Sequence, residues 1–231
     1  MQVRQNIANF LTLLNLLSGT LALYFIFQDD FRTAFLLVLA GIGFDFLDGL
    51  VARATGTGSE LGLQLDSMAD LITSGLVPGY FLFQAYHHVH PGSPVAYVAL
   101  LIPAASAVRL ARFNLDTRQK THFIGLPTPA NALFLISLGF ILLDQAHFLS
   151  GPLQNPWIFS ALILLSAWLL NSPIPLIALK FKGFSPQKDI IKILLILTSG
   201  LILALKGIYG IPLIMVVYFL FSYLEFSRKG D

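Results

Sequence analysis

The 231-residue chain contains no cysteine and few charged residues. Without cysteine, disulfides, thiolate metal sites and cysteine nucleophiles are all excluded. Charged residues make up 11% of the chain, whereas an ordinary soluble domain carries roughly 25%. The formal net charge is only +2, which is too small to favour nucleic-acid binding. The composition therefore excludes a soluble globular domain, because too few charges are present to cover a water-facing surface.

Apolar residues take the place of the missing charges. Hydrophobic residues account for 56% of the chain, including 20 Phe and 7 Tyr, and the mean hydropathy is +0.77, which excludes disorder. A helix that crosses the hydrocarbon core of a bilayer needs on the order of 20 apolar residues. Such segments lie near residues 7–27, 33–53, 66–86, 95–114, 129–149, 157–179, 189–206 and 208–226. The sequence predicts an all-α, polytopic membrane helical bundle with about eight transmembrane helices.

The basic residues predict how this bundle is oriented. Lys and Arg prefer cytoplasmic loops. With the N-terminus inside, only Arg32 and Lys206 of the 14 Lys and Arg fall on the outer side. We therefore expect the N- and C-termini to lie inside, in the cytoplasmic membrane. No repeat or long linker divides the chain, so residues 1–231 are expected to form a single membrane domain.

Four carboxylates lie close together in the sequence, within predicted spans. Asp45 and Asp48 are spaced i, i+3 and Asp66 and Asp70 i, i+4, so each pair shares one helix face. Buried carboxylates repel one another unless cations neutralise them, and an all-oxygen cluster suits Mg²⁺ or Mn²⁺. A site for two divalent cations, which clamps phosphates, is the favoured interpretation. The alternatives are a helix cap at Asp66, an ion pair with Arg53, or a relay, as in a cation transporter.

The spacing Asp45-x2-Asp48-Gly49-x2-Ala52-Arg53-x8-Gly62-x3-Asp66-x3-Asp70 resembles the signature of the CDP-alcohol phosphotransferases. The resemblance covers residues 5–180 as a six-helix core, and leaves two additional C-terminal helices in 181–231. It implies transfer of a phosphatidyl group from a CDP-linked lipid to an alcohol, with release of CMP, and a homodimer. It also implies that Asp45, Asp48, Asp66 and Asp70 hold two divalent cations, Mg²⁺ or Mn²⁺, and that Asp70 is the general base.

The same resemblance suggests which residues bind the CDP-lipid. Asp48, Gly49, Ala52, Arg53 and Gly62 would surround it, with Arg53 donating to the diphosphate. Asn9 and Thr12 resemble a family element, Pro-Asn-x2-Thr, that lies near the nucleotide, with Ala8 in place of the proline. The alternative for this segment is N-capping by Asn6 or Asn9.

Two further strings resemble the serine-accepting branch of the family, the phosphatidylserine synthases. They are Arg109-Leu110-Ala111-Arg112-Phe113-Asn114 and Gly125-Leu126-Pro127-Thr128-Pro129-Ala130. Arg109 and Arg112 suit the carboxylate of L-serine or the lipid phosphate, with Asn114 as an amide partner, although both arginines could be membrane-orientation anchors. The expected substrates are CDP-diacylglycerol and L-serine. Glycerol 3-phosphate, inositol, inositol phosphate and choline are the alternative acceptors.

Overall fold

The computed structural model describes residues 2–56, 59–116, 122–179 and 189–227, and it is almost entirely helical. The predicted boundary between residues 180 and 181 lies outside these residues. The α-helices are α1 (Gln2–Phe27), α2 (Phe31–Thr55), α3 (Glu60–Asp70), α4 (Val77–Val89), α5 (Leu101–Leu115), α6 (Thr128–Leu143), α7 (Ser150–Gln154), α8 (Pro156–Asn171), α9 (Ile190–Lys206) and α10 (Ile211–Ser227). A π-helix (Leu71–Leu76) joins α3 to α4, and 3-10 helices occupy Pro94–Leu100 and Gly207–Gly210. The predicted all-α fold class is confirmed.

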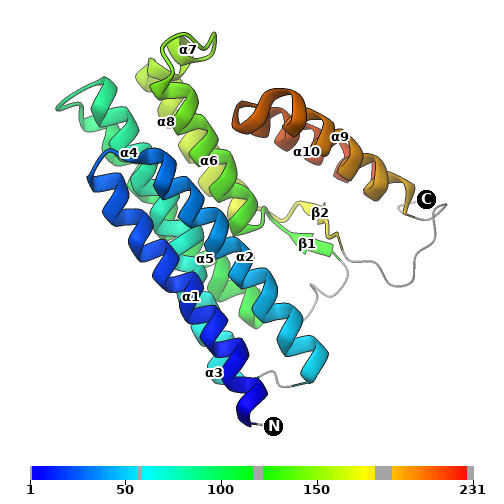
Figure 1. Ribbon diagram of the computed structural model, residues 1–231. Helices are drawn as coiled ribbons and strands as arrows, with labels where there is room; N and C mark the ends of the chain where they lie inside the picture. The colour runs from blue at the N-terminus through cyan, green and yellow to red at the C-terminus, as the bar shows by residue number, and fades with distance from the viewer. Residues whose placement is uncertain (1, 57–58, 117–121, 180–188, 228–231) are drawn as a thin grey trace.

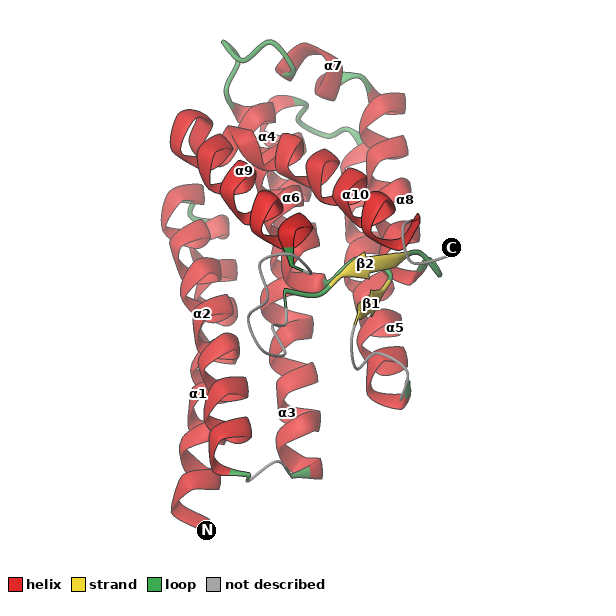
Figure 2. Cartoon of the chain, turned by 90° about the vertical axis from the view of Figure 1, so that its right-hand side faces the viewer, coloured by secondary structure: helices red, strands yellow, loops and turns green. Residues whose placement is uncertain are grey.

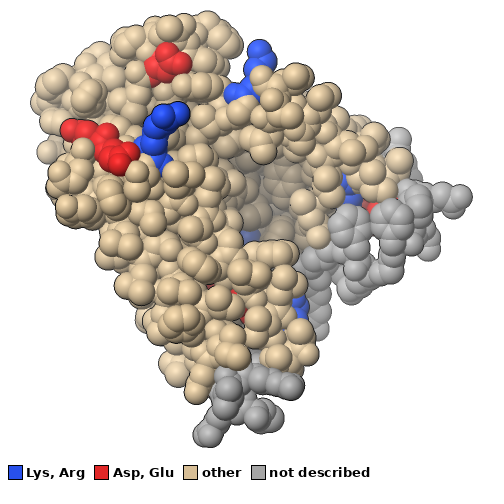
Figure 3. All heavy atoms as spheres, in the orientation of Figure 1, with Lys and Arg blue, Asp and Glu red and all other residues tan. Residues whose placement is uncertain are grey.

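In the part of the chain that the structure describes, four helical segments are long and apolar enough to cross a membrane. They are Asn6–Phe27, Phe31–Thr55, Pro94–Leu115 and Ile190–Ser227, and α6 and α8 are shorter apolar helices of 16 residues each. Large apolar side chains are exposed along these segments, and charges are sparse on the face shown in Figure 3. The chain is therefore a multi-pass membrane protein, and the count of about eight spans stays a prediction.

The hydrophobic core lies toward one end of the bundle. It is formed by the C-terminal half of α1, the N-terminal half of α2, α4, and parts of α5, α6 and α8, which run alongside one another in Figure 1. In this core the ring of Phe31 meets the ring of Phe81 edge to face, and Phe81 lies tilted against Phe140. The other halves of α1 and α2 instead bury polar residues, among them Thr12, Asn15 and Asp48. The core therefore ends where the carboxylates begin.

The ends of α2 are fixed by residues that suit helix termini. Asp30 accepts a hydrogen bond from the backbone of Thr33, and hydrogen bonds from Thr33 lower the pKa of this carboxyl. Gly56 follows the helix with a φ of 63°, a left-handed conformation that glycine adopts without strain. This geometry turns the chain toward α3 directly after the Asp45–Arg53 segment.

The helix that carries the second aspartate pair differs from its predicted bounds. It begins at Glu60, where Ser59 accepts a hydrogen bond from the backbone of Gly62 at 3.0 Å, and not near residue 66. Asp66 therefore lies inside the helix and does not cap it. The helix continues through the π-helix to Val89, so Asp66 lies within regular α-helix and Asp70 lies where the α-helix passes into the π-helix.

The described residues also form two short strands, which the all-α prediction did not include. Strand β1 (His122–Ile124) pairs antiparallel with β2 (Pro175–Ile177), with Phe123 opposite Leu176. Helices α9 and α10 form a tight hairpin, and Figure 2 shows this hairpin beside the strands. Tyr218 of α10 donates to the Ile177 carbonyl at 2.9 Å, and the Ile177 amide donates to Ser222 at 3.2 Å. Strand β2 therefore joins the C-terminal hairpin to the bundle.

Candidate active site

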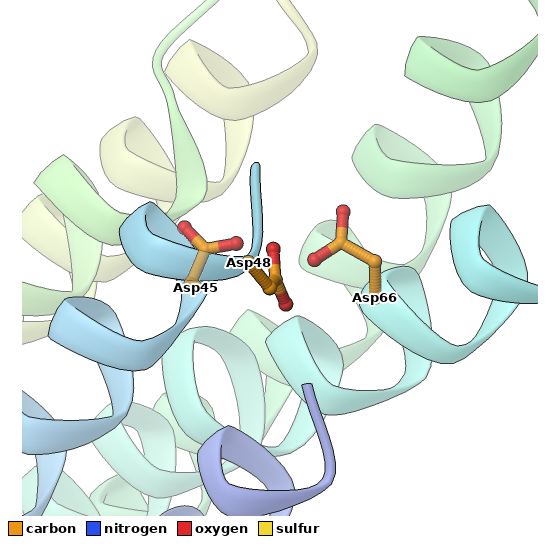
Figure 4. A group of neighbouring side chains, drawn as sticks. All are labelled: Asp45, Asp48 and Asp66. Atoms are coloured by element: carbon orange, nitrogen blue, oxygen red, sulfur yellow. The ribbon is translucent and has the colours of Figure 1, made fainter. Parts of the chain in front are cut away.

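Helices α2 and α3 bring three aspartates together. One carboxylate oxygen from each of Asp45, Asp48 and Asp66 lies within 4.8 Å of the other two. Figure 4 shows the Asp45 and Asp48 side chains leaving adjacent turns of α2 and the Asp66 side chain approaching from α3. The i, i+3 spacing places the first two on one face of α2, as the sequence predicted. We call these three residues the carboxylate cluster.

Asp70 lies one turn beyond Asp66 but outside this group of three. Its carboxylate interacts electrostatically with Asp45 and Asp66, and its Oδ1 accepts a hydrogen bond from Asn15 Nδ2 of α1 at 3.2 Å. The structure therefore brings all four predicted aspartates into one region, with Asp70 directed partly toward α1. Its roles as a metal ligand and general base stay predictions.

The carboxylate cluster has the properties of a cation site. Two like charges 4.8 Å apart repel by about 3 kcal/mol at an effective dielectric constant of about 20. Within the part of the chain that the structure describes, no Lys or Arg forms an ion pair with Asp45, Asp48 or Asp66. Asp66 Oδ1 is buried and has no hydrogen-bond partner. An all-oxygen donor set with an orphaned carboxylate oxygen fits a hard divalent cation such as Mg²⁺ or Mn²⁺.

Helix α1 supports the carboxylates with hydrogen bonds from two buried residues. Thr12, which is 4% exposed, donates from Oγ1 to Asp48 Oδ2 at 2.5 Å. Asn15, which is fully buried, donates to Asp70. The sequence analysis assigned Thr12 to the nucleotide and gave no role to Asn15. The signal for Asn15 was present, because Asn9, Thr12 and Asn15 recur every three residues along α1.

The predicted CDP-lipid residues lie around the same end of α2 and α3. The guanidinium of Arg53 folds back over Gly49, where a Cβ atom would come within 3.2 Å of Nη1. A Cβ on Gly62 would come within 3.2 Å of Asn9 Oδ1. Ala52 lies on the turn of α2 between Asp48 and the helix end. Because α1 begins at Gln2, Asn6 and Asn9 are interior helical residues, so the N-capping alternative is wrong.

The two predicted acceptor arginines line one cavity of about 460 Å³. Arg109 is 5% exposed and donates from Nε to the Leu126 carbonyl at 3.3 Å. Its guanidinium lies over the ring of Phe113, 5.5 Å from the ring centre. Arg112 is exposed at the cavity, which is also lined by Asp116, Asn171 and Ser172. The two sequence strings that resembled the serine-accepting branch therefore meet in space at Arg109 and Leu126.

Asn114 links the helix of these arginines to the aspartate-bearing helix. Its Nδ2 donates to the hydroxyl of Ser67 at 2.8 Å, and Ser67 is the neighbour of Asp66 in α3. Asn114 is not among the residues that line the cavity. In the structure it therefore fixes α5 against α3, and a direct contact with the acceptor stays a prediction.

These features define a multi-pass membrane protein whose carboxylate cluster suits divalent cations. The sequence profile of the CDP-alcohol phosphatidyltransferase family matches residues 5–171, and the chain belongs to that family. A protein of Methanocaldococcus jannaschii named CDP-diacylglycerol–serine O-phosphatidyltransferase is 33% identical over 227 residues, which cover 97% of this chain and 96% of that protein. A Helicobacter pylori protein of the same name is 29% identical over 222 residues, or 94% and 89% of the two chains.

Proposed function

We propose that this protein transfers the phosphatidyl group of CDP-diacylglycerol to the hydroxyl of L-serine and releases CMP. The observation that carries the proposal is the gathering of Asp45, Asp48 and Asp66 at the end of the bundle where Arg53 and Gly62 also lie. Family membership and relatives of nearly equal length that carry this activity in their names support the choice of substrates. The reaction belongs to phospholipid synthesis.

The aspartates would hold the cations and Asp70 would move the proton. Asp45, Asp48, Asp66 and Asp70 would bind two divalent cations, Mg²⁺ or Mn²⁺, which would neutralise the diphosphate and polarise the lipid-linked phosphorus. Asp70 would accept the proton of the serine hydroxyl. The serine oxygen forms a new bond to phosphorus as the bond between phosphorus and the CMP oxygen breaks, and CMP leaves with its electron pair. Asn9, Thr12, Gly49, Ala52, Arg53 and Gly62 would position the CDP-lipid.

The arginine-lined cavity supports serine as the acceptor. Serine carries a carboxylate, which a guanidinium binds through two parallel hydrogen bonds. Arg109 and Arg112 are spaced i, i+3 on α5 and line the same cavity, so one could hold this carboxylate and the other the lipid phosphate. Inositol and choline carry neither a carboxylate nor a phosphate for a second arginine to bind. Glycerol 3-phosphate and inositol phosphate carry a phosphate that a guanidinium also binds, so the comparison of acceptors below decides between serine and these two.

The proposed setting is the cytoplasmic membrane, with both termini and the active site at the cytoplasmic face. The basic residues Arg53 and Arg112 lie at the ends of α2 and α5 nearest the carboxylates, which is the arrangement that the positive-inside rule predicts. We also propose a homodimer, as the family resemblance implies.

The experiment measures CMP release from CDP-diacylglycerol by the purified protein with Mn²⁺ or Mg²⁺. The acceptors are L-serine, glycerol 3-phosphate, inositol, inositol phosphate and choline, each tested separately and against no acceptor. We expect CMP and a serine-containing lipid only when serine and metal are both present. Release with another acceptor would reject serine but keep the phosphotransfer. Cation flux into proteoliposomes, with no CMP released by any acceptor, would replace the enzyme with a cation transporter.

The variant Asp70→Asn tests the proposed base. We expect CMP release to be abolished, because an amide cannot accept the serine proton, while binding of CDP-diacylglycerol remains measurable. Near-normal turnover by this variant would remove Asp70 as the base. Binding measured in the same preparation controls for loss of the fold.

A further inference from the structure

Asn15 of α1 is fully buried, and one of its two side-chain polar atoms has a partner. Nδ2 donates to Asp70 Oδ1 at 3.2 Å, whereas Oδ1 is buried and has no hydrogen-bond partner among the residues that the structure describes. A buried amide that is only half satisfied lowers the stability of the fold relative to an apolar side chain of similar size. The stability of the bundle therefore does not explain why an asparagine occupies this position. Its contact with Asp70 does explain it.

The orientation of this amide follows from its surroundings. A flipped amide would place a carbonyl oxygen against the Asp70 carboxylate, and two acceptors repel each other. Oδ1 instead faces the backbone of α2 at Gly41, where a Cβ atom would come within 2.9 Å of it. The missing side chain at Gly41 leaves room for the amide in the orientation that donates to Asp70.

The backbone of Asn15 is tied to the same segment as its side chain. Thr73 lies three residues after Asp70, in the π-helix, and its hydroxyl donates to the Asn15 carbonyl at 3.0 Å. A side chain at Gly19 would collide with this hydroxyl. Both ends of the Asp70–Thr73 segment are therefore fixed against one residue of α1. A π-helix that directly follows a functional side chain is a recurrent feature of ligand sites.

We propose that Asn15 is a positioning residue for Asp70. By holding Oδ1 against α1, Asn15 leaves Oδ2 as the oxygen available to a cation or to the acceptor hydroxyl, and it stops the carboxylate from rotating about its last bond. The proposal rests on the proposed function only for the identity of the acceptor. The interaction itself is testable without substrate.

The first test is Asn15→Leu, which keeps the branched shape of the side chain, with two larger methyl groups in place of the amide atoms, and removes the donor. Ser18→Ala is the matched control, because Ser18 is a buried residue one turn further along α1 whose hydroxyl donates to the Leu14 carbonyl of its own helix. We expect the Mn²⁺ concentration for half-maximal thermal stabilisation to rise about 10-fold or more, and kcat for CMP release to fall about 10- to 100-fold. The KM for CDP-diacylglycerol should change by no more than about twofold, since Asn15 is not placed against the lipid.

The second test exchanges the two partners, which covers the case in which Asn15→Leu fails to fold. Asn15→Asp places a carboxylate against Asp70 and should lower the thermal unfolding midpoint measured in chelator. Adding Asp70→Asn restores an amide–carboxylate pair in reverse, and the double variant should recover more stability than the two single changes predict. This cycle requires neither metal nor turnover, so it remains informative if the wild-type protein releases no CMP with serine.

Two results would overturn the proposal. One is an Asn15→Leu protein that matches Ser18→Ala in Mn²⁺ requirement and in kcat. The other is additive midpoints in the exchange cycle, which would mean that Asn15 and Asp70 do not interact. A wild-type protein that is stabilised by Mn²⁺ but inactive with every acceptor would instead reject the proposed function and leave the Asn15–Asp70 interaction standing.

Discussion

At the scale of single residues, the Thr12 hydroxyl has one proton and two acceptors within reach. The Ala8 carbonyl lies at 3.1 Å and Asp48 Oδ2 at 2.5 Å, so the shorter, charge-assisted contact takes the proton. The Thr12 hydroxyl therefore holds one carboxylate oxygen of Asp48 in place, in the same way that Asn15 holds one oxygen of Asp70. The two residues are i, i+3 on α1 and together form an outer layer around the carboxylates.

Thr12→Val should therefore weaken metal binding without changing the fold. Valine has the shape of threonine but lacks the donor, and loss of such an outer-layer hydrogen bond typically weakens metal affinity by about 10- to 100-fold. The measurement is the Mn²⁺ concentration that gives half-maximal CMP release. Thr20→Val is the control, because the exposed Thr20 hydroxyl bonds only to the Leu16 carbonyl of the same helix. Equal Mn²⁺ requirements in the two variants would contradict the role given to Thr12.

The surroundings of Gly49 allow a prediction about binding of CDP-diacylglycerol. In Gly49→Ala the new methyl group would lie 3.2 Å from Arg53 Nη1, so the flexible guanidinium moves aside and the helix stays intact. We expect the KM for CDP-diacylglycerol to rise about 10-fold, because the displaced Arg53 would lose one good hydrogen bond to the charged diphosphate.

Gly43→Ala in the same helix is the matched control for Gly49→Ala. A Cβ atom at position 43 would contact nothing within 4 Å, so this variant should keep its KM. It should also be stabilised by about 0.5–1 kcal/mol, because alanine favours helix over glycine. A normal KM in Gly49→Ala would show that Arg53 does not bind the diphosphate from its present position.

Much of the candidate site could be predicted from the sequence, because its chemistry depends on spacing within single helices. The i, i+3 spacing of Asp45 and Asp48 fixed their common face before any helix packing was known. The sequence did not predict which side chains of different helices contact one another. The contacts of Asn15 with Asp70 and of Asn114 with Ser67 join residues 55 and 47 positions apart, and no local pattern specifies which side chains meet over such separations.

At the scale of helices, the close packing of α1, α2 and the π-helix depends on two glycines. Gly19 faces the hydroxyl of Thr73 and Gly41 faces its methyl group, so three backbones approach closely around one side chain. Small residues commonly allow such approaches in membrane bundles, where lipid offers no hydrophobic driving force for association. This contact lies between the apolar core and the carboxylates, and it sets the register in which α1 faces Asp48 and Asp70.

Gly19→Ala should disturb the register in which α1 faces Asp48 and Asp70. The added methyl group would meet the Thr73 backbone at 3.0 Å as well as its hydroxyl, and backbone atoms cannot move aside as a flexible side chain can. We expect the free energy of unfolding to fall by about 1–3 kcal/mol, as in overpacked cores. Kcat should fall too, because Asn15 moves relative to Asp70. Thermal unfolding in detergent and CMP release measure both effects, and a protein as stable and active as Gly43→Ala would contradict this account.

The helices themselves followed from length and hydropathy, but the breaks between them did not. The apolar stretch 157–179 predicted one continuous helix, but α8 ends at Asn171 and strand β2 follows it. A strand of three residues carries too little pattern to be recognised alone. Its partner, β1, lies about 50 residues earlier in the chain, so this pairing is specified by packing against α10 and not by local sequence.

At the scale of the whole molecule, the C-terminal hairpin has little of its surface buried within the chain. Only 17% of the most apolar window in Ile190–Ser227 is buried, and the hairpin contacts the bundle chiefly through β2 and α6. Lipid or a second subunit would therefore cover most of its apolar surface. Strand β2 follows Ser172 and Pro173, which line the arginine cavity, so the attachment of the hairpin and the shape of that cavity depend on the same short segment.

The orientation of the molecule in the membrane gives the last prediction, and the absence of cysteine makes it simple to test. Leu115, at the end of α5 near the arginines, is 84% exposed, and Phe148, just before α7, is 80% exposed. These two segments lie at opposite ends of the bundle (Figure 2). If the active site faces the cytoplasm, a membrane-impermeant maleimide should label Phe148→Cys in right-side-out vesicles and Leu115→Cys only in inverted ones. The cysteine-free parent supplies a zero background in both preparations. The reverse pattern would place the basic ends of α2 and α5 outside, against the positive-inside rule, and would require CDP-diacylglycerol to be used at the outer face.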